Sequence, residues 1–490
     1  MKTARLVSLI QGASIYKSDR GPDREIGDIK ADSRSVSPGD SFIALNGTRT
    51  RGSRFIPEAL KAGASVVIFD NDAVPDMPEG TDATWIHVPD TKKALDEILP
   101  FVFPGASKIA LTGITGTSGK TTTAWLIESI LKEAGYSPGL IGTIETRYKE
   151  KVVASMLTTP GSIELFQCLD EMYSAGCRAC VMEVSSHALD QNRTGNLGFE
   201  TAVFTNLGQD HLDYHLEMSD YFEAKKRLFT EHLKGRAIIN YDDLYGKKLI
   251  TSLDNPITFG FCDDAMVHAT QIKADIRGIW LDISTHKGPL SIMSPLVGRF
   301  HAFNIMAATG ACMAMGIHKD AIKKGIASLQ GVPGRMEYIQ NPYQRNIIVD
   351  FAHKPNALQQ AITSARELTR GTLTVLFGCG GDRDSLKRPM MGQIAAHMAD
   401  RVCLTSDNPR SEDPDSIITD ILEGIEDSSD VEIQPDRAKA IKDAIRAMTK
   451  NDTLLVAGKG HETCQIMGSQ RLPFDDRTEV IKALKEVFEQ

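Results

Sequence analysis

Short apolar runs alternate with segments of helical periodicity along most of the chain, a pattern that predicts parallel strands covered by helices. In the last third, strands are predicted at residues 347–351, 373–377, 401–405 and 453–457, and helices at 357–368, 389–399, 415–425 and 479–488. Polar segments follow these strands at 350–353, 378–384, 406–410 and 458–462. Because ligands of open α/β sheets bind beyond the carboxyl ends of strands, this region is predicted to bind a ligand.

Two breaks divide the chain into three blocks. The segments Phe103-Pro104-Gly105 and Gly331-Val332-Pro333-Gly334 have the composition of linkers. We therefore predict an α/β protein with three domains, at residues 1–105, 106–333 and 334–490. In the middle block, strands are predicted at 108–113, 179–184, 202–206 and 237–240, and a long helix at 302–315.

Composition narrows the possible functions. A chain of 490 residues is too long for one hydrophobic core, and its 41% hydrophobic and 24% charged content is ordinary for a globular protein. The net charge of −9 argues against a nucleic-acid or membrane-surface binder, which would be basic. No apolar run approaches the length of a membrane span, and eight cysteines fit a reducing cytoplasm better than a disulfide framework.

The segment 115–123, TGTSGKTTT, carries the most specific chemical signal. It follows an apolar strand and precedes a helix, so its backbone N–H groups can surround phosphate oxygens. Lys120 would supply charge to the β- and γ-phosphates, and the Thr121 hydroxyl would bind Mg²⁺. Ile114 stands where the strict phosphate-loop pattern has glycine, and the alternative is a chance glycine–lysine turn. The flanking strand and helix favour an ATP site.

Lys225 has an unusual place in the helical segment 219–233. At about 100° per residue it falls in the middle of the apolar face, whereas Lys226 lies near its edge. A desolvated lysine amine has a lowered pKa and can react with CO₂ to give an anionic, metal-binding carbamate. The alternative is that Lys225 reaches the surface past its neighbours. Glu183 ends another apolar strand and could bind Mg²⁺ or be solvated, and His211 alone is a weak signal.

In order along the chain, the segments TGTSGKTT, EVSSHALDQNR, TNLGQDHLDYH, GRFHAFN and GVPGRME resemble the motifs of the Mur ligases. The resemblance extends from about residue 29 to the C-terminus. It implies an N-terminal UDP-binding α/β domain, a central phosphate-loop ATPase domain with a mostly parallel sheet, and a C-terminal Rossmann-like domain. It also implies an ATP-dependent, ADP-forming ligase of peptidoglycan precursor synthesis.

The resemblance also implies roles for individual residues. The catalytic residues would be Lys120, Lys225, His211 and Glu183, and Mg²⁺ would be held by Thr121, Glu183, His211 and Lys225 as its carbamate, N6-carboxylysine. ATP would be bound by Gly116, Thr117, Ser118, Gly119, Lys120, Thr121, Thr122, Asn304 and Arg335. A UDP-muramoyl dipeptide would contact Ser33, Thr48, Arg49, Thr50, Thr158, Thr159, Ser185, Gln191 and Arg193.

The segment DNPR, residues 407–410, is typical of Mur ligases that add meso-2,6-diaminopimelate to UDP-N-acetylmuramoyl-L-alanyl-D-glutamate. Diaminopimelate has a second amino-acid end, whose carboxylate suits a bidentate guanidinium and whose ammonium suits oxygen acceptors. The resemblance further implies ATP as co-substrate, CO₂ for the carbamate, and a cytoplasmic monomer without nucleic acid or membrane insertion. The expected diaminopimelate contacts are Arg383, Asp407, Asn408, Pro409, Arg410, Gly458 and Glu462.

Residues 350–356 read D-F-A-H-K-P-N where the family pattern is D-Y-A-H-T-P-D, and the departures at Lys354 and Asn356 change the charge. Both fall near the expected ATP contact and bear on nucleotide affinity rather than on the reaction class. The alternatives are L-lysine or another diamino acid as substrate, another Mur or folylpolyglutamate-type ligase, and a catalytically idle ATP-binding partner protein. The complete set of Lys120, Glu183, His211 and Lys225 argues against the last of these.

Overall fold

The computed structural model describes residues 2–18, 23–47, 50–70, 82–211, 214–426 and 430–489. The chain forms two compact units, of which the first contains residues 1–115, 136–202 and 211–236. The second contains residues 116–135, 203–210 and 237–490. The phosphate-loop segment therefore belongs to the second unit, whereas Glu183 and Lys225 belong to the first.

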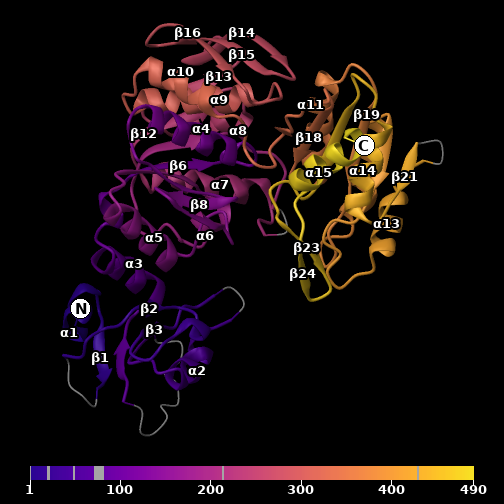
Figure 1. The fold of residues 1–490 in the computed structure, drawn as a ribbon. Coiled ribbons are helices and arrows are strands. Elements are labelled where there is room, and N and C mark those ends of the chain that lie inside the picture. The colour runs from indigo at the N-terminus through magenta and orange to yellow at the C-terminus, as the bar shows by residue number, and fades with distance from the viewer. Residues whose placement is uncertain are drawn as a thin grey trace. The chain divides into compact units, whose positions relative to one another are not determined.

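The N-terminal part of the first unit is a five-stranded sheet in the order β1-β5-β4-β3-β2, in which only β1 runs antiparallel to its neighbour (Figure 1). The run Val66–Phe69 is buried at every position, as expected for a parallel strand covered on both faces. The bounds are β1 (Ser14–Lys17), β2 (Ile29–Lys30), β3 (Ser41–Ile43), β4 (Val66–Phe69), β5 (Thr84–His87), α1 (Thr3–Leu9), α2 (Ile56–Lys61), α3 (Thr91–Val102), and the 3₁₀ turns η1 (Ser33–Ser35), η2 (Gly52–Phe55) and η3 (Ala106–Lys108).

The rest of the first unit contains the parallel strands β6, β10 and β7, followed by the antiparallel hairpin of β8 and β9. Glu183 pairs with Ile114 at the end of β6, so the carboxylate stands beside the strand that leads into the phosphate loop. The elements are β6 (Ala110–Thr115), β7 (Gly139–Ile141), β8 (Glu145–Tyr148), β9 (Lys151–Ala154), β10 (Ala179–Glu183), α5 (Ser162–Ser174), α6 (Ser186–Asp190) and α7 (Met218–Thr230).

The predicted end of one helical segment falls in the following strand. The helical segment was predicted to continue to residue 233, but α7 ends at Thr230 and Leu233 begins β12 (Leu233–Asn240). Leu233 continues the apolar periodicity of the helix, and periodicity alone does not separate a last helical turn from a following strand. Both β12 and β11 (Phe199–Phe204) contain a boundary between the two units.

The second unit begins with α4, the helix that follows the phosphate loop, and continues into strands β13 to β16, of which the last three are antiparallel neighbours. Helix α9 has twelve buried residues and packs on β13 and β14. The bounds are α4 (Lys120–Glu133), α8 (Leu244–Ile250), β13 (Ile257–Gly260), β14 (Val267–Asp275), β15 (Gly278–Thr285), β16 (Leu290–Ser294), α9 (His301–Ala314) and α10 (Lys319–Ser328).

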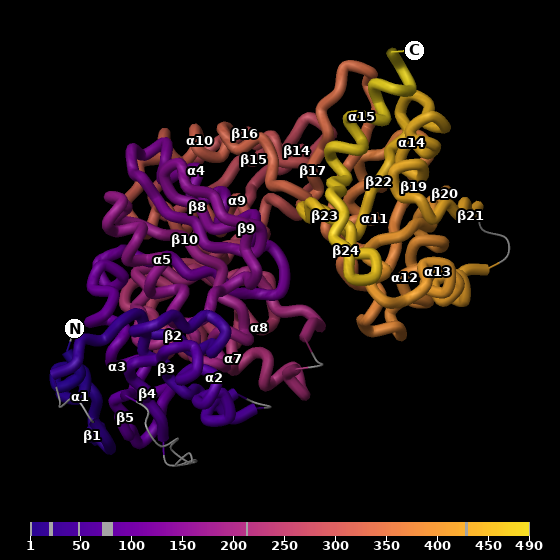
Figure 2. Tube along the Cα trace, turned by 60° about the horizontal axis from the view of Figure 1, so that its bottom comes forward, coloured from indigo at the N-terminus to yellow at the C-terminus, as the bar shows by residue number. Residues whose placement is uncertain are grey.

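The C-terminal part of the second unit is a six-stranded sheet in the order β17-β18-β22-β19-β20-β21, parallel except for β17. Helices α11, α12 and α13 share one hydrophobic core with it, and α14 and α15 share another, so both faces are covered (Figure 2). The predicted strands 373–377 and 453–457 are confirmed residue for residue. The bounds are β17 (Glu337–Tyr338), β18 (Asn346–Asp350), β19 (Leu373–Phe377), β20 (Arg401–Leu404), β21 (Val431–Ile433), β22 (Thr453–Ala457), β23 (Cys464–Met467), β24 (Gln470–Pro473), α11 (Pro355–Leu368), α12 (Lys387–Met398), α13 (Pro414–Leu422), α14 (Arg437–Ala447) and α15 (Asp476–Phe488).

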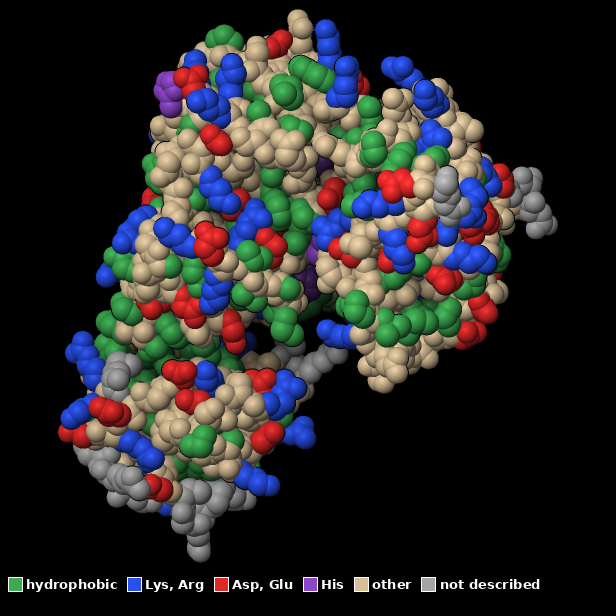
Figure 3. Space-filling view, viewed as in Figure 1, with side chains coloured by type: hydrophobic (Ala, Val, Ile, Leu, Met, Phe, Trp, Pro, Cys, Tyr) green, Lys and Arg blue, Asp and Glu red, His purple; other side chains and the backbone are tan. Residues whose placement is uncertain are grey.

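Acidic and basic side chains are interspersed over the face of the molecule drawn in Figure 3, and neither sign dominates it. Within the described part of the chain, no helix combines the length and the apolar character needed to cross a bilayer.

Asp96 on α3 gives a pH-dependent test of the first unit. Burial raises the pKa of Asp96 to about 6, with a further contribution from the charge of Asp90. Its carboxylate accepts a hydrogen bond from Asn192 Nδ2 at 2.5 Å. Because the folded-state pKa is raised, the contribution of Asp96 to stability is present below about pH 4 and is lost as the pH rises through about 6.

We therefore expect Asp96→Asn to stabilise the protein at pH 7.5 by about 1 kcal/mol, a value reduced for partial solvent screening, and to have no effect near pH 4. Thermal midpoints of both proteins across this range measure the difference. Asp254→Asn, at an exposed aspartate, is the matched control and should show no pH-dependent difference. An Asp96→Asn effect of equal size at both pH values would contradict this account.

Candidate functional site

The phosphate loop connects β6 to α4 through Gly116 and Gly119, which both have positive φ and closely packed surroundings. Gly116 has φ +145°, and a Cβ there would lie 1.9 Å from Thr205 Oγ1. Gly119 has φ +86°, and a Cβ there would lie 2.4 Å from Asn304 Oδ1. The predicted strand–loop–helix sequence is thus present, and the loop backbone is closely packed.

Lys120 is the first residue of α4, and its Nζ donates to the carbonyl oxygens of Gly116 at 2.7 Å and Thr117 at 2.9 Å. The ammonium therefore lies against the backbone of the loop. Thr121 follows it and is 5% exposed, and Thr122 is 3% exposed. A cation beside backbone N–H groups at a helix N-terminus suits the phosphates of a nucleotide.

Residues after β11 hold the loop in place. Thr205 Oγ1 donates to the Ser118 carbonyl at 2.7 Å, and Asn206 Oδ1 accepts the Ser118 N–H at 2.9 Å. Asn304, predicted to contact ATP, is buried, and its Nδ2 lies 3.1 Å from Nδ1 of His301. Burial lowers the pKa of His301 to about 3, so this imidazole is neutral at physiological pH.

Two side chains from the C-terminal part of the second unit, Arg335 and Lys354, contact the first turn of α4 and the segment after β11. Arg335 Nη2 lies 3.5 Å from Thr121 Oγ1, and its guanidinium stacks 5.1 Å from the centre of the Phe351 ring. Lys354, which departs from the family pattern, forms an ion pair with Asp210. Asp210 directly precedes His211 in the sequence, so this ion pair joins the 350–356 segment to the central motif.

In the first unit, a hydrogen-bonded cluster surrounds Glu183. Its two carboxylate oxygens accept the N–H of Thr143 at 2.8 Å and the hydroxyl of Thr143 at 2.9 Å. Thr143 Oγ1 lies 3.1 Å from Thr158 Oγ1, and Thr159 Oγ1 donates to the Glu183 carbonyl at 2.9 Å. A carboxylate among hydroxyls supplies the oxygen ligands that Mg²⁺ takes. Thr143 was not predicted from the sequence, because no motif marks it.

Other residues predicted to contact the dipeptide join this cluster. The Ser185 N–H donates to Thr159 Oγ1 at 3.0 Å, and Arg193 Nη1 donates to the Thr159 carbonyl at 3.0 Å. Gln191 Oε1 accepts two further bonds from Arg193, at 3.0 and 2.7 Å. Burial lowers the pKa of Arg193. A partly buried guanidinium is thus held in place near Glu183, where it suits a carboxylate.

Lys225 is 1% exposed, so the alternative that it reaches the surface is wrong. Its Nζ lies 4.5 Å from the centre of the Tyr221 ring, while Lys226 pairs with Glu223 at 3.0 Å on the outside of α7. His211 has φ +54°, and its ring lies 6.1 Å from that of Tyr221. Within the described residues, no three His, Cys, Asp or Glu side chains form a metal-binding group. Mg²⁺ binding and the carbamate stay predictions.

The N-terminal contacts are only partly described. Ser33 is buried and donates from its hydroxyl to Glu58 Oε2 at 2.8 Å, and Thr50 is exposed. Thr48 and Arg49 lie outside the described residues.

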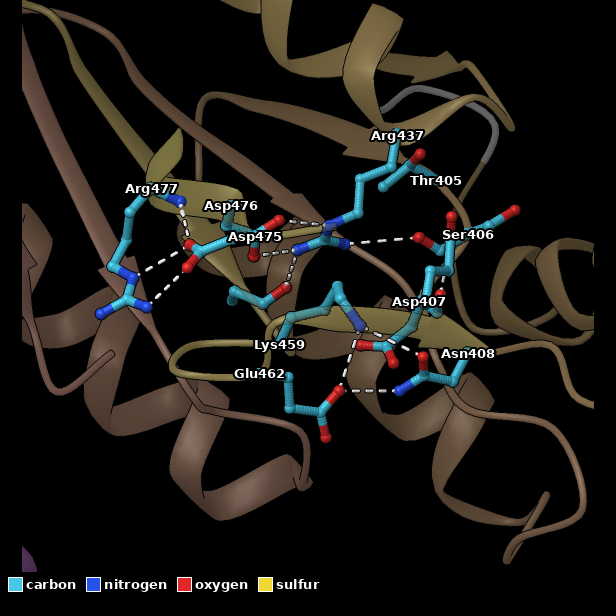
Figure 4. Close-up of polar contacts among 12 residues, drawn as sticks. Thr405, Ser406, Asp407, Asn408, Arg437, Lys459, Glu462, Asp475, Asp476 and Arg477 are labelled. Atoms are coloured by element: carbon cyan, nitrogen blue, oxygen red, sulfur yellow. Dashed lines mark hydrogen bonds and ion pairs between the residues drawn. The ribbon is translucent and has the colours of Figure 1, made fainter. Parts of the chain in front are cut away.

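Three of the predicted diaminopimelate residues, Asp407, Asn408 and Glu462, lie close together beyond β20 and β22 (Figure 4). Asn408 Nδ2 donates to Glu462 Oε2 at 2.8 Å, and a Cβ on Gly458, at φ +115°, would lie 2.5 Å from Asp407 Oδ2. Burial raises the pKa of Asp407, while the charges of Arg437 and Lys459 oppose the rise. Pro409 is buried, whereas Arg383 is exposed and donates from Nη1 to the Asp382 carbonyl at 3.2 Å.

Arg410 has φ +54°, in the left-handed region, and the hairpin of β23 and β24 holds its backbone. Its N–H donates to the Ile466 carbonyl at 3.0 Å, and its carbonyl accepts the Gly468 N–H at 2.6 Å. The guanidinium Nη1 donates to the Gly381 carbonyl at 2.7 Å. A long side chain in this backbone conformation requires support from its surroundings, and the hairpin provides it.

The sequence did not single out two buried cations of this region. Arg437 is fully buried and forms a bidentate pair with Asp476, with both distances 2.7 Å. Lys459 is also fully buried, among Asn408, Glu462 and Cys464. The sequence feature that could have indicated Lys459 is its position directly after a buried strand, between two glycines.

Comparison with known proteins gives the class. Models of the Mur ligase family catalytic domain, the Mur ligase middle domain and the Mur ligase glutamate ligase domain match residues 25–101, 114–312 and 334–460. With the phosphate loop, these matches define an ATP-dependent, ADP-forming amide ligase of three α/β domains. The chain belongs to the Mur ligase family.

Individual relatives cover nearly the whole chain. It is 44% identical over 472 residues to the UDP-N-acetylmuramoyl-L-alanyl-D-glutamate–2,6-diaminopimelate ligase of Nostoc sp. strain PCC 7120, with 95% of each covered. It is 41% identical to the ligase of the same name from Thermosynechococcus vestitus, with 99% of each covered. A solved structure of a ligase of that name superposes with a TM-score of 0.69 at 31% identity, over 99% of both chains.

Proposed function

We propose that the chain joins meso-2,6-diaminopimelate to UDP-N-acetylmuramoyl-L-alanyl-D-glutamate, with conversion of ATP to ADP and phosphate. The observation that carries this proposal is the cluster of Asp407, Asn408, Arg410 and Glu462, in a chain whose relatives carry that activity in their names. A guanidinium and a group of oxygen acceptors side by side match the carboxylate and the ammonium at the second end of diaminopimelate.

The reaction would proceed through an acyl phosphate. The D-glutamate side-chain carboxylate attacks the γ-phosphorus of ATP, and ADP leaves. The diaminopimelate amine then attacks the acyl carbon, loses a proton and displaces inorganic phosphate, which carries away one former carboxylate oxygen. Lys120 and the backbone N–H groups of residues 116–122 would hold the ATP phosphates.

The residues around Glu183 would prepare the dipeptide for this step. Arg193, held by Gln191 and the Thr159 carbonyl, would bind a dipeptide carboxylate, and Ser185 and Thr158 would donate hydrogen bonds. Glu183, Thr121, His211 and the carbamate of Lys225 would hold Mg²⁺. The metal would neutralise charge that develops on the transferred phosphoryl group. We place the reaction in the cytoplasm, in a monomer, and all eight cysteines are free, as a reducing compartment requires.

Phosphate release with the UDP-muramoyl dipeptide, ATP and a panel of amino acids tests the proposal. Diaminopimelate should support turnover, and L-lysine, which lacks the second carboxylate, should be at least about 10²-fold poorer in kcat/KM. Dipeptide labelled with ¹⁸O in its carboxylate should transfer label to the released phosphate. Turnover with lysine but not diaminopimelate would refute the assignment of Arg410, and turnover only with a folate and glutamate would refute the proposed substrates.

A further inference from the structure

Lys459 is a fully buried lysine at the carboxyl end of β22, and its ammonium makes three hydrogen bonds (Figure 4). Nζ donates to Asn408 Oδ1 at 3.1 Å, to Glu462 Oε2 at 3.0 Å and to the Cys464 carbonyl at 2.7 Å. A lysine ammonium has three donors and no acceptor, so these three bonds use its full capacity. Lys459 therefore has no donor left for a substrate, and its influence must pass through its neighbours.

The first neighbour is Asn408, whose amide orientation these contacts determine. Asn408 Oδ1 accepts from Lys459 and also from the Ile466 N–H at 2.9 Å, while Nδ2 donates to Glu462 Oε2 at 2.8 Å. Rotating the amide by 180° would set its NH₂ group against the ammonium and the backbone N–H. Both contacts would then be lost and replaced by opposed donors.

The second neighbour is Glu462, a carboxylate that is partly exposed. Both of its described side-chain bonds, from Lys459 and Asn408, end on Oε2. This arrangement fixes the carboxylate plane and presents Oε1 as the oxygen that can accept from an incoming ammonium. In Figure 4 that second oxygen points away from Lys459.

The charge of Lys459 is also matched to its surroundings. Two carboxylates, Asp407 and Glu462, lie in this cluster, and the other buried cation, Arg437, is already paired with Asp476. Lys459 is thus the cation in direct contact with the groups proposed to receive the substrate. A buried, fully bonded cation of this kind holds its partners in one geometry.

We propose that Lys459 is a positioning residue for amino-acid selection, which directly and through the Asn408 amide sets the Glu462 carboxylate to receive the distal ammonium of diaminopimelate. This inference rests on the proposed function. Its readout is the preference for diaminopimelate over 2-aminopimelate, which keeps both carboxylates and one amino group but lacks the distal ammonium. A site built to bond that ammonium should prefer diaminopimelate by on the order of 10⁴-fold in kcat/KM.

In Lys459→Met, which keeps an unbranched side chain but removes the ammonium donors, we expect this preference to fall by about 10²-fold, because misplacement of a binding group by about 1 Å costs that much. The loss should appear as a higher KM for diaminopimelate. The KM values for ATP and the UDP-muramoyl dipeptide should change by no more than about twofold, because Lys459 does not contact the residues proposed to bind them. Lys482→Met, at an exposed lysine of α15, is the matched control and should keep the full preference.

Lys459→Gln, which retains an NH₂ donor without the charge, serves as the second variant should Lys459→Met fail to fold, and we expect a fall of about tenfold. An unchanged preference in either folded variant, or a uniform loss for both amino acids, would overturn the role of Lys459 while leaving the proposed function intact. Absence of any wild-type turnover with diaminopimelate would overturn the proposed function and this inference with it.

Discussion

Replacement of Lys225 by alanine is expected to lower ligase turnover by about 10³-fold or more. Lys225 lies on the buried face of α7, 1% exposed, with its amine 4.5 Å from the centre of the Tyr221 ring. The neutral form of a lysine amine is the form that adds CO₂. The carbamate would carry an oxygen ligand and a negative charge to the metal site, and alanine supplies neither.

Phosphate release in the presence of all three substrates measures this loss. Short carboxylic acids such as acetate should restore part of the activity to Lys225→Ala, because they can occupy the space and supply the missing carboxylate oxygens. Lys226→Ala, one residue further on and paired with Glu223 outside the core, is the control and should stay near wild-type turnover. Wild-type activity in Lys225→Ala would remove the carbamate from the mechanism, and a loss that no carboxylic acid relieves would assign Lys225 a purely structural part.

The burial of Lys225 shows what periodicity can predict. Its angular position on α7 followed from the spacing of apolar residues, and the structure confirms the buried face. The apolar periodicity also continues to residue 233, where β12 begins, because an apolar residue fits the pattern of a helix or of a strand. Local spacing thus predicts which face of a helix is buried better than where the helix ends.

Contacts between segments that are distant in the chain could not be predicted from the sequence. In the sequence, Lys354 is only a departure from the family pattern, whereas its ion pair with Asp210 spans 144 positions of the chain. Lys459 stands in a recognised segment, yet its role depends on Asn408, 51 positions earlier. A motif reports residue types at fixed spacing, whereas a buried polar network depends on how strands are ordered in the sheet. Here β22 lies between β18 and β19, which brings the GKGHE and DFAH segments to one edge.

Arg410→Ala is expected to lower kcat/KM for diaminopimelate by about 10³-fold, because truncating one member of a desolvated charge pair costs several kcal/mol. The loss should be confined to the amino acid, since the KM values for ATP and the dipeptide depend on other residues. Arg410→Lys keeps the charge without the planar fork and should lose about 10²-fold. Arg446→Ala, at an exposed arginine of α14, is the control and should leave kcat/KM unchanged.

The backbone at Arg410 allows a second, independent measurement. At φ +54° a side chain with a Cβ is strained by about 1 kcal/mol, whereas glycine is not. Arg410→Gly should therefore lower kcat/KM for diaminopimelate as much as Arg410→Ala does, yet have the higher thermal midpoint of the two. Such a result would mean that the chain has an arginine at a position where glycine would be less strained, because only the guanidinium binds the substrate. An Arg410→Gly enzyme that still prefers diaminopimelate to lysine would refute this role, and a midpoint below that of Arg410→Ala would refute the strain.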